Sequence, residues 1–200
     1  CIMKYIAIYH ANLNYSGLEP ERYEFVIRNS YEKILDMYND GLNGLPFCFE
    51  ASGYTKDTIA EYCPDVLEKL QEAAKGGCEL IASPYPHTML PNFPYDDGKK
   101  TLEFTLESFQ KHFGIIPETG WNPECGWRQD VPQMFKEAGF KNMIIDWDGY
   151  LISNYEEIDK FERGDGPYGH DLPYYKVDPD DPTLHFPVKM CIFYRTDIKR

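Results

Sequence analysis

Short apolar runs alternate with longer amphipathic stretches along most of the chain. The runs are rich in β-branched and aromatic residues, and several end in a polar residue, which is typical of buried parallel strands. Between them, apolar residues recur every three or four positions, the spacing of helices that bury one face. The pattern predicts strands at residues 4–10, 45–50, 78–83, 119–124 (short, or partly an exit loop), 142–147 and 186–194.

Local signals mark where the predicted helices begin and end. Ser52 or Thr55 can cap the helical region after the second strand, and Pro64 interrupts that region. The dipeptide Asp97-Gly98 predicts a turn ahead of a further helix. Strand and helix thus alternate about five times, and this order predicts an α/β fold with a parallel sheet and helical crossovers.

Two architectures share this order, an open doubly wound sheet and a (β/α) barrel. Polar residues at the ends of several predicted strands favour the barrel, because its active sites gather at that face. A complete barrel usually needs about 250 residues, and the chain has 200. We therefore expect an incomplete barrel, or a longer domain cut short. The polar strand-end residues are His10, Glu50, Ser83, Glu124, Asp146 and Asp148.

Residues 155–182 break the alternation. They are rich in glycine, aspartate and proline and contain few branched apolar residues. Such a segment predicts a long excursion loop on the surface, placed to face a substrate as a lid.

Composition excludes several classes of protein. The chain carries 20 Lys and Arg against 33 Asp and Glu, a formal charge of −13, which argues against a nucleic-acid binder. A hydrophobic content of 42% excludes a disordered chain, and no run is long enough for a membrane helix. The six cysteines include no CxxC pair, and several lie in apolar runs. We expect buried free thiols and a cytoplasmic protein.

The densest group of chemically useful residues is Trp121-Asn122-Pro123-Glu124-Cys125-Gly126-Trp127. Tryptophan faces stack on sugar rings, and a carboxylate beneath the ring can attack an anomeric carbon. A salt-bridged glutamate between core tryptophans would give the same pattern. The group therefore indicates a sugar site with a structural alternative.

Other polar residues in the strands and loops are further candidates. Glu79 lies in a strand that should be buried, so its carboxylate needs a specific partner. His87, in a loop rich in proline and aromatic residues, and His10, at the end of the first strand, can hydrogen-bond a sugar; His10 could also ligate a metal. Asp148 follows the fifth strand and could approach the site. Each also fits a purely structural role.

The motifs together resemble glycoside hydrolase family 57. Residues 121–124 resemble its nucleophile motif, residues 77–80 its second conserved region, and the strand end at His10 its first; the order, the spacing and the loop at residues 83–87 also match. The resemblance covers essentially the whole chain. It implies an incomplete (β/α)7 barrel, a single catalytic domain over residues 1–200, and a retaining reaction on α-glycosidic bonds, usually of α-glucans.

The resemblance also implies roles for individual residues. Glu124 would be the nucleophile that forms a covalent glycosyl-enzyme. The family's acid/base is an Asp in a later motif, which we expect beyond residue 200, since nothing before Arg200 matches it. No cofactor or metal is expected; the partner would be an oligo- or polysaccharide, with a homo-oligomer possible. The residues lining the substrate site would be His10, Glu79, His87, Trp121, Trp127 and Asp148.

Two alternatives stay open. A non-catalytic carbohydrate-binding protein could keep the barrel and line a groove with some of its 16 tyrosines and three tryptophans. A metal-dependent polysaccharide deacetylase would use a related barrel, but it needs an Asp pair and closely spaced histidines. The five histidines of this chain include no close pair.

Overall fold

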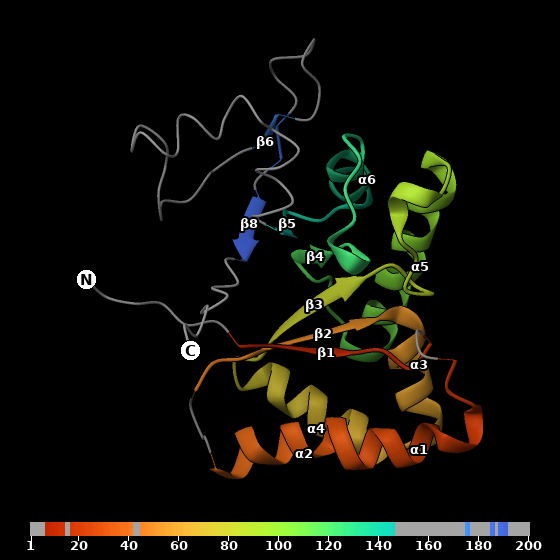
Figure 1. The fold of residues 1–200 in the computed structure, drawn as a ribbon. Coiled ribbons are helices and arrows are strands. Elements are labelled where there is room, and N and C mark those ends of the chain that lie inside the picture. Colours follow the sequence, from red (N-terminus) through yellow and green to blue (C-terminus); the bar gives the residue numbers. More distant parts are fainter. Residues whose placement is uncertain are drawn as a thin grey trace, which may run out of the picture.

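The computed structural model describes residues 7–14, 17–41 and 45–146, together with short strands at 175–176, 185–186 and 188–191. Six parallel strands form one sheet in the order β1-β2-β3-β4-β5-β8 (Figure 1). They are β1 (Ile8–Ala11), β2 (Cys48–Ser52), β3 (Glu79–Ser83), β4 (Thr119–Trp121), β5 (Asn142–Asp146) and β8 (Val188–Cys191). A separate antiparallel pair joins β6 (Tyr175–Lys176) to β7 (His185–Phe186).

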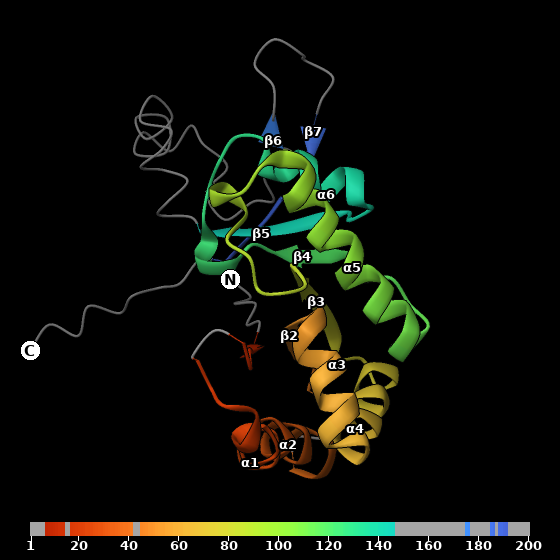
Figure 2. The same cartoon turned by 90° about the vertical axis from the view of Figure 1, so that its right-hand side faces the viewer.

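The helices follow the strands in sequence and line one side of the sheet (Figures 1 and 2). Parallel strands in sequential order, with their helices on one side, are the arrangement of a (β/α) barrel. Among the described residues β1 and β8 form the two edges, so the barrel does not close there. The predicted α/β class is confirmed. The α-helices are α1 (Tyr23–Val26), α2 (Glu32–Asp36), α3 (Gly53–Tyr62), α4 (Pro64–Lys75), α5 (Tyr95–Phe113) and α6 (Val131–Ala138).

Shorter helical turns complete the crossovers. A 3-10 turn η1 (Pro20–Arg22) and π-helical turns η2 (Ile27–Tyr31) and η3 (Met37–Gly41) join α1 and α2 into one irregular helix. Two further 3-10 turns, η4 (Leu90–Asn92) and η5 (Pro123–Cys125), follow β3 and β4. Each of these last two begins at or next to a proline, whose fixed φ suits the first turn of a helix.

The two faces of the sheet bury different side chains. The face toward the helices carries the main core, which includes Phe49 and Leu80 from the strands. The opposite face, here called the inner face, holds a smaller apolar cluster of Cys48, Ile81 and Ile144. Side chains alternate between the faces along a strand, so residues two positions beyond this cluster also point to the inner face. The polar ends of β2 and β3 are therefore inner-face residues.

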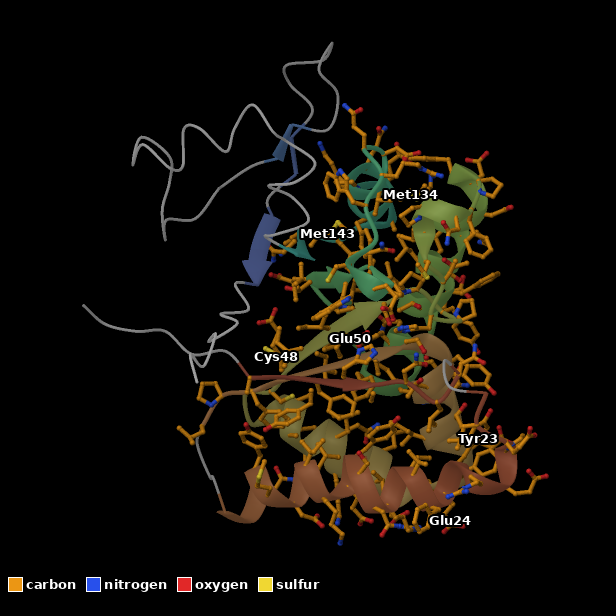
Figure 3. All side chains as sticks on the ribbon, viewed as in Figure 1. Tyr23, Glu24, Cys48, Glu50, Met134 and Met143 are labelled. Carbon is orange, nitrogen blue, oxygen red and sulfur yellow. The ribbon has the colours of Figure 1, made fainter. Side chains whose placement is uncertain are left out.

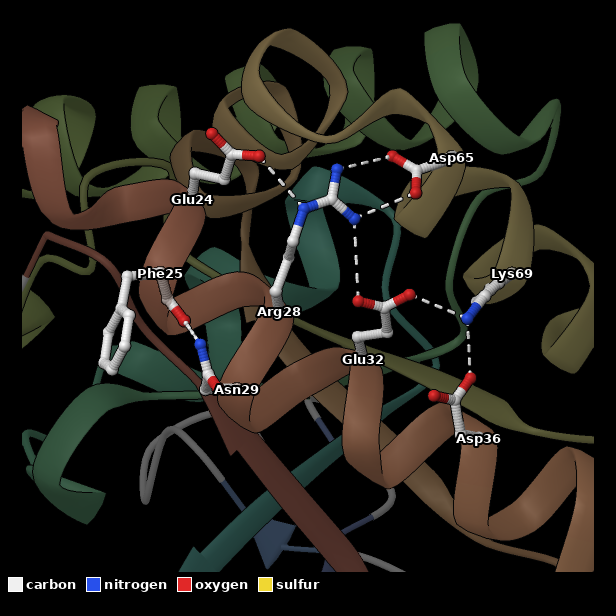
Figure 4. Close-up of polar contacts among 8 residues, drawn as sticks. All are labelled: Glu24, Phe25, Arg28, Asn29, Glu32, Asp36, Asp65 and Lys69. Carbon is white, nitrogen blue, oxygen red and sulfur yellow. Dashed lines mark hydrogen bonds and ion pairs between the residues drawn. The ribbon is translucent and has the colours of Figure 1, made fainter.

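Ion pairs fasten the first helices to α4 on the side away from the inner face (Figure 4). Lys69 of α4 lies 2.7 Å from Glu32 and 2.6 Å from Asp36. Arg28 reaches across to Asp65 at 2.9 Å. These pairs are partly exposed and each contributes little alone, but together they fix how the helices sit beneath β1 and β2.

Several local predictions are confirmed. The Ser52 hydroxyl caps α3 by accepting a hydrogen bond from the Thr55 amide at 3.2 Å, and the helical region breaks at Pro64. Of the described cysteines, Cys48, Cys63 and Cys78 are buried and Cys125 is partly buried, and none of the four forms a disulfide. No helix in the described part of the chain is long and apolar enough to cross a membrane. The predicted loop at residues 155–182 lies outside the described residues, apart from β6.

The predicted turn at Asp97-Gly98 is wrong, because both residues lie in the first turns of α5. Acidic side chains stabilise a helix at its N-terminus, which favours Asp96 and Asp97 there. Gly98 serves packing instead of a turn. A Cβ added to it would lie 3.0 Å from the Met134 sulfur, so the absence of a side chain lets α5 approach α6.

Candidate functional site

Polar side chains meet on the inner face at the carboxyl ends of β1 and β2. His10 and Glu50 are partners in the parallel register, so their side chains lie next to each other on one face. The Glu50 Oε2 atom pairs with His10 Nδ1. Glu50 is labelled among the side chains of the sheet in Figure 3. Glu50 is completely buried, while the His10 side chain is 45% exposed. The pair therefore joins a buried carboxylate to an imidazole that solvent or a ligand can reach.

The loop after β3 brings His87 to the same place. The His87 ring centre lies 5.1 Å from that of His10, and His87 is buried. Its backbone is left-handed, with φ 56°, and its amide donates to the Pro84 carbonyl at 2.8 Å. Asn14, just after β1, donates from its side chain to the Pro86 carbonyl at 3.3 Å. The loop is thus fixed to the end of β1.

The turn after β4 presents Glu124. Glu124 and Cys125 both have left-handed backbones, with φ 57° and 49°. Together with His87 they are the three non-glycine residues of this kind in the described part of the chain. A left-handed conformation is unfavourable for residues with a side chain, and such strain is concentrated at functional sites. The surrounding fold therefore holds the Glu124 backbone in a conformation that presents an exposed carboxylate.

Asn122 connects this turn to the loop that carries His87. The Asn122 side chain is completely buried. Its oxygen accepts from the Leu90 amide at 3.2 Å, and its nitrogen donates to the Gly126 carbonyl at 2.5 Å. Arg128 adds hydrogen bonds to the Pro91 carbonyl at 2.9 Å and the Phe93 carbonyl at 3.0 Å. The two loops form one unit, which positions His87 and Glu124 together.

The two histidines differ in their preference for charge. The hydrogen bond to Glu50 raises the pKa of His10; burial opposes this, and the negative charges of Glu50 and Glu124 add to it. Burial lowers the pKa of His87, against the opposing pull of Glu50 and Glu124. Neighbouring groups whose environments drive their pKa values apart can take separate roles in one reaction. The site therefore favours the charged form of His10 and the neutral form of His87.

The two predicted tryptophans lie in different surroundings. Trp121 packs on the inner-face cluster, and its ring centre is 6.1 Å from that of His10. Trp127 packs against the main core and is only partly buried. The structure thus brings His10, His87, Trp121 and Glu124 to one end of the sheet, while Trp127 borders this group through the turn that follows Glu124.

Glu79 does not lie in this group. It was expected inside a buried strand, but it is the exposed first residue of β3. Its carboxylate accepts a hydrogen bond from Thr119 at 2.6 Å. The register pairs Glu79 with Cys48, two residues before Glu50, so Glu79 lies toward the opposite end of the strands. Asp148, the remaining candidate, lies outside the described residues.

Glu50 is the residue that sequence reasoning noticed but did not assign to the site. The sequence did contain a signal for this role. Glu50 follows Phe-Cys-Phe in a predicted buried strand, and a buried carboxylate needs a cationic or hydrogen-bonding partner. In the described part of the chain, no group of three or more His, Cys, Asp or Glu side chains could hold a metal ion.

Comparison with known proteins agrees with this arrangement of strands. The sequence profile of glycosyl hydrolase family 57 matches residues 2–188. The chain belongs to glycosyl hydrolase family 57. The resemblance inferred from the motifs is therefore confirmed. No curated protein is similar to this family 57 chain at a significant level.

Solved structures with a similar fold include members of the same family. The 4-α-glucanotransferase of Thermococcus litoralis is 21% identical, with a TM-score of 0.58 over 70% of this chain and 22% of its own. The α-amylase AmyC of Thermotoga maritima is 15% identical, with a TM-score of 0.58 over 70% of this chain and 39% of its own. A branching enzyme of Thermococcus kodakaraensis is 17% identical, with a TM-score of 0.54 over 70% and 39%. This family 57 chain thus spans well under half the length of these proteins.

Proposed function

We propose that this family 57 protein is a retaining glycoside hydrolase or transglycosylase that acts on the α-glycosidic bonds of α-glucans, with Glu124 as the nucleophile. The observation that carries the proposal is the left-handed turn that presents the Glu124 carboxylate opposite His10 and His87. The structural neighbours named as glucanotransferase, α-amylase and branching enzyme support α-glucans as the substrate class.

In the proposed reaction, the Glu124 carboxylate attacks the anomeric carbon while the bond to the leaving oxygen breaks. A second carboxyl group protonates that oxygen and later takes a proton from water or from an acceptor hydroxyl. Retaining enzymes hold the two groups about 5–5.5 Å apart. Glu50 does not suit this second role, because it is completely buried and bonded to His10. We assign the role to an Asp beyond residue 200.

The remaining residues would bind the sugar. The exposed side of His10 and the ring of His87 can hydrogen-bond hydroxyl groups, and Trp121 offers an indole face beside them. Trp127 would border the site at the turn. We leave Glu79 out of the sugar site, because it lies toward the other end of β3.

The test is Glu124→Gln in the full-length native protein, assayed on maltoheptaose. We expect turnover to fall by roughly 10³-fold or more, since the step that forms the glycosyl-enzyme is lost. Sugar binding and the unfolding midpoint should stay close to those of the unmodified protein. Glu61→Gln, which changes an exposed glutamate on α3, is the matched control and should be fully active.

A mechanism-based 5-fluoroglycosyl fluoride gives a direct readout of the covalent step. It should label the peptide that contains Glu124, as seen by mass spectrometry, and should not label the Gln variant. Unchanged turnover in Glu124→Gln would refute the nucleophile assignment. Maltoheptaose binding without any turnover by the unmodified protein would favour the non-catalytic sugar-binding alternative.

The buried thiols of Cys48, Cys63 and Cys78 support the further expectation of a reducing, cytoplasmic location.

A further inference from the structure

Glu50 is an unusual residue for the position it occupies. Its side chain is completely buried in the middle of the parallel sheet. Oε2 pairs with His10, and Oε1 has no hydrogen-bond partner among the described residues. A buried carboxylate is costly unless a cation or donors compensate it, and removing its partner is more costly still. Burial of this kind needs a reason beyond packing.

The groups that face Glu50 come from four elements. His10 of β1 is in direct contact, and His87 approaches from the loop after β3. Lys56 of α3 is completely buried and interacts electrostatically with Glu50, as does the phenol of Tyr31. Burial lowers the pKa of Lys56 well below its ordinary value, and its Nζ atom is already engaged, with the Ser52 carbonyl at 3.3 Å and the Phe109 ring centre at 3.6 Å. His10 is therefore the charge partner in direct contact with Glu50.

His10 has two different sides. The Nδ1 side is taken by Glu50 inside the protein, while the His10 side chain as a whole is 45% exposed. The ring centres of His87 and Trp121 lie 5.1 and 6.1 Å from that of His10. The negative charge of Glu124, on the turn after β4, also acts on His10. When one ring nitrogen bonds a carboxylate, the tautomer and the orientation of the ring are set by that bond. The other ring nitrogen, Nε2, is then the atom of His10 that can hydrogen-bond a ligand in the site.

We propose that Glu50 is a positioning residue: its buried carboxylate holds His10 by Nδ1, fixes Nε2–H as the donor toward the sugar, and keeps a positive charge beside Glu124. The consequence for the sugar rests on the proposed function, but the coupling of Glu50 to His10 does not. A merely structural Glu50 would contribute to stability and couple to the titration of His10, but it would leave turnover and its pH profile unchanged. A positioning Glu50 controls that titration and, through it, the pH profile of turnover.

The first test follows the histidines by NMR in the full-length native protein labelled with ¹⁵N-histidine. We expect His10 to titrate above its ordinary pKa of about 6.5. In Glu50→Gln, the carboxylate is replaced by a neutral amide of the same shape, and the pKa of His10 should fall by about one or more. An ordinary or low His10 pKa in the unmodified protein would overturn the proposal without any variant. So would an unchanged His10 pKa in Glu50→Gln.

A second carboxylate–histidine pair provides the matched control. Asp57 of α3 lies 2.6 Å from His112 of α5, so this pair joins two helices and does not involve the strand ends that carry His10 and Glu50. Asp57→Asn removes the carboxylate of that pair and should leave the titration of His10 in place. If Glu50→Gln does not fold, Glu50→Asp keeps the charge on a shorter side chain and should retain a raised His10 pKa. A shift of His10 equally large in Asp57→Asn would overturn the specific coupling.

Kinetics on maltoheptaose separate this proposal from the proposed function. Glu50→Gln should lower kcat/KM by about 10–100-fold, the usual loss when a group that orients a functional histidine is removed. The basic limb of its pH profile should move to lower pH, and Glu50→Asp should restore part of both. An active variant with an unchanged pH profile overturns the positioning role. Absent turnover in the unmodified protein, with His10 still coupled to Glu50, overturns the proposed reaction and supports the pairing.

Discussion

Replacing Asn122 with alanine tests whether one buried side chain holds the two loops of the site together. Asn122 accepts from the Leu90 amide at 3.2 Å and donates to the Gly126 carbonyl at 2.5 Å. Alanine can do neither. The variant leaves the buried Leu90 amide without its acceptor and frees the turn that holds Glu124 in a left-handed backbone.

The magnitude follows from the burial of the groups left behind. Leu90 is completely buried, so its unpaired amide should cost about 1–3 kcal/mol, whereas the partly exposed Gly126 carbonyl regains water at a smaller cost. Removing the Asn122 side chain from a fully buried position adds a small cavity. We expect Asn122→Ala to lower the free energy of unfolding by about 2–4 kcal/mol.

The assay is urea denaturation followed by circular dichroism, with the slope of the transition checked for two-state behaviour. Asn29→Ala is the matched control, because Asn29 is exposed and makes one hydrogen bond, to the Phe25 carbonyl at 2.8 Å (Figure 4). Its effect should stay within about 0.5 kcal/mol. Equal midpoints for the two variants would refute the view that Asn122 joins the loops. On maltoheptaose, Asn122→Ala should also lose turnover while still folded.

Two further predictions concern the packing around the site. Burial raises the pKa of Asp57, but hydrogen bonds from Tyr85, His112 and Ser108 lower it below its ordinary 3.8. The ionised form therefore stabilises the fold above that value, and the stabilisation is lost as the pH falls through the lower folded-state pKa. Asp57→Asn should cost about 1–3 kcal/mol at pH 7 and progressively less below pH 4, whereas a cost that is constant down to pH 3 would contradict this. Gly120→Ala would place a Cβ 2.3 Å from the Phe135 ring and should lower the free energy of unfolding, measured by denaturation, by about 1–3 kcal/mol. Gly76→Ala is the control and should be tolerated, because its added Cβ would meet no atom closer than 3.4 Å. Equal losses of stability in the two variants would contradict the close approach at Gly120.

The order of strands and helices could be predicted from the sequence because it depends on local patterns. Apolar runs of strand length and stripes of helical spacing are properties of neighbouring residues, and Ser52 and Pro64 act within one turn of their position. The error at Asp97-Gly98 came from a tertiary contact. Gly98 looks like a turn residue, but its place is decided by Met134 on another helix. Local signals cannot report that contact.

The site was harder to predict because it depends on register between strands. Glu50 and His10 are 40 residues apart and meet because Ile8 pairs with Cys48. Glu79 illustrates the opposite case. Its position before Leu80-Ile81-Ala82 marks it as the start of the strand, so an apolar run that follows a charge is better evidence for an amino end than for a buried carboxylate. A charged residue that precedes an apolar run lies at the amino end of the strand, and one that follows the run lies toward the carboxyl end, where the site is.

Backbone strain at the site is beyond what residue types predict. Glutamate, cysteine and histidine give no signal for a left-handed backbone, yet His87, Glu124 and Cys125 adopt one. Each such residue costs of the order of 1–3 kcal/mol and persists only where surrounding contacts fix it. Asn122 and Arg128 supply such contacts, since both bond carbonyls or amides of the opposite loop. The residue that would attack a sugar is therefore held in place by residues that need not touch the sugar, and variants at Asn122 should affect stability and turnover together.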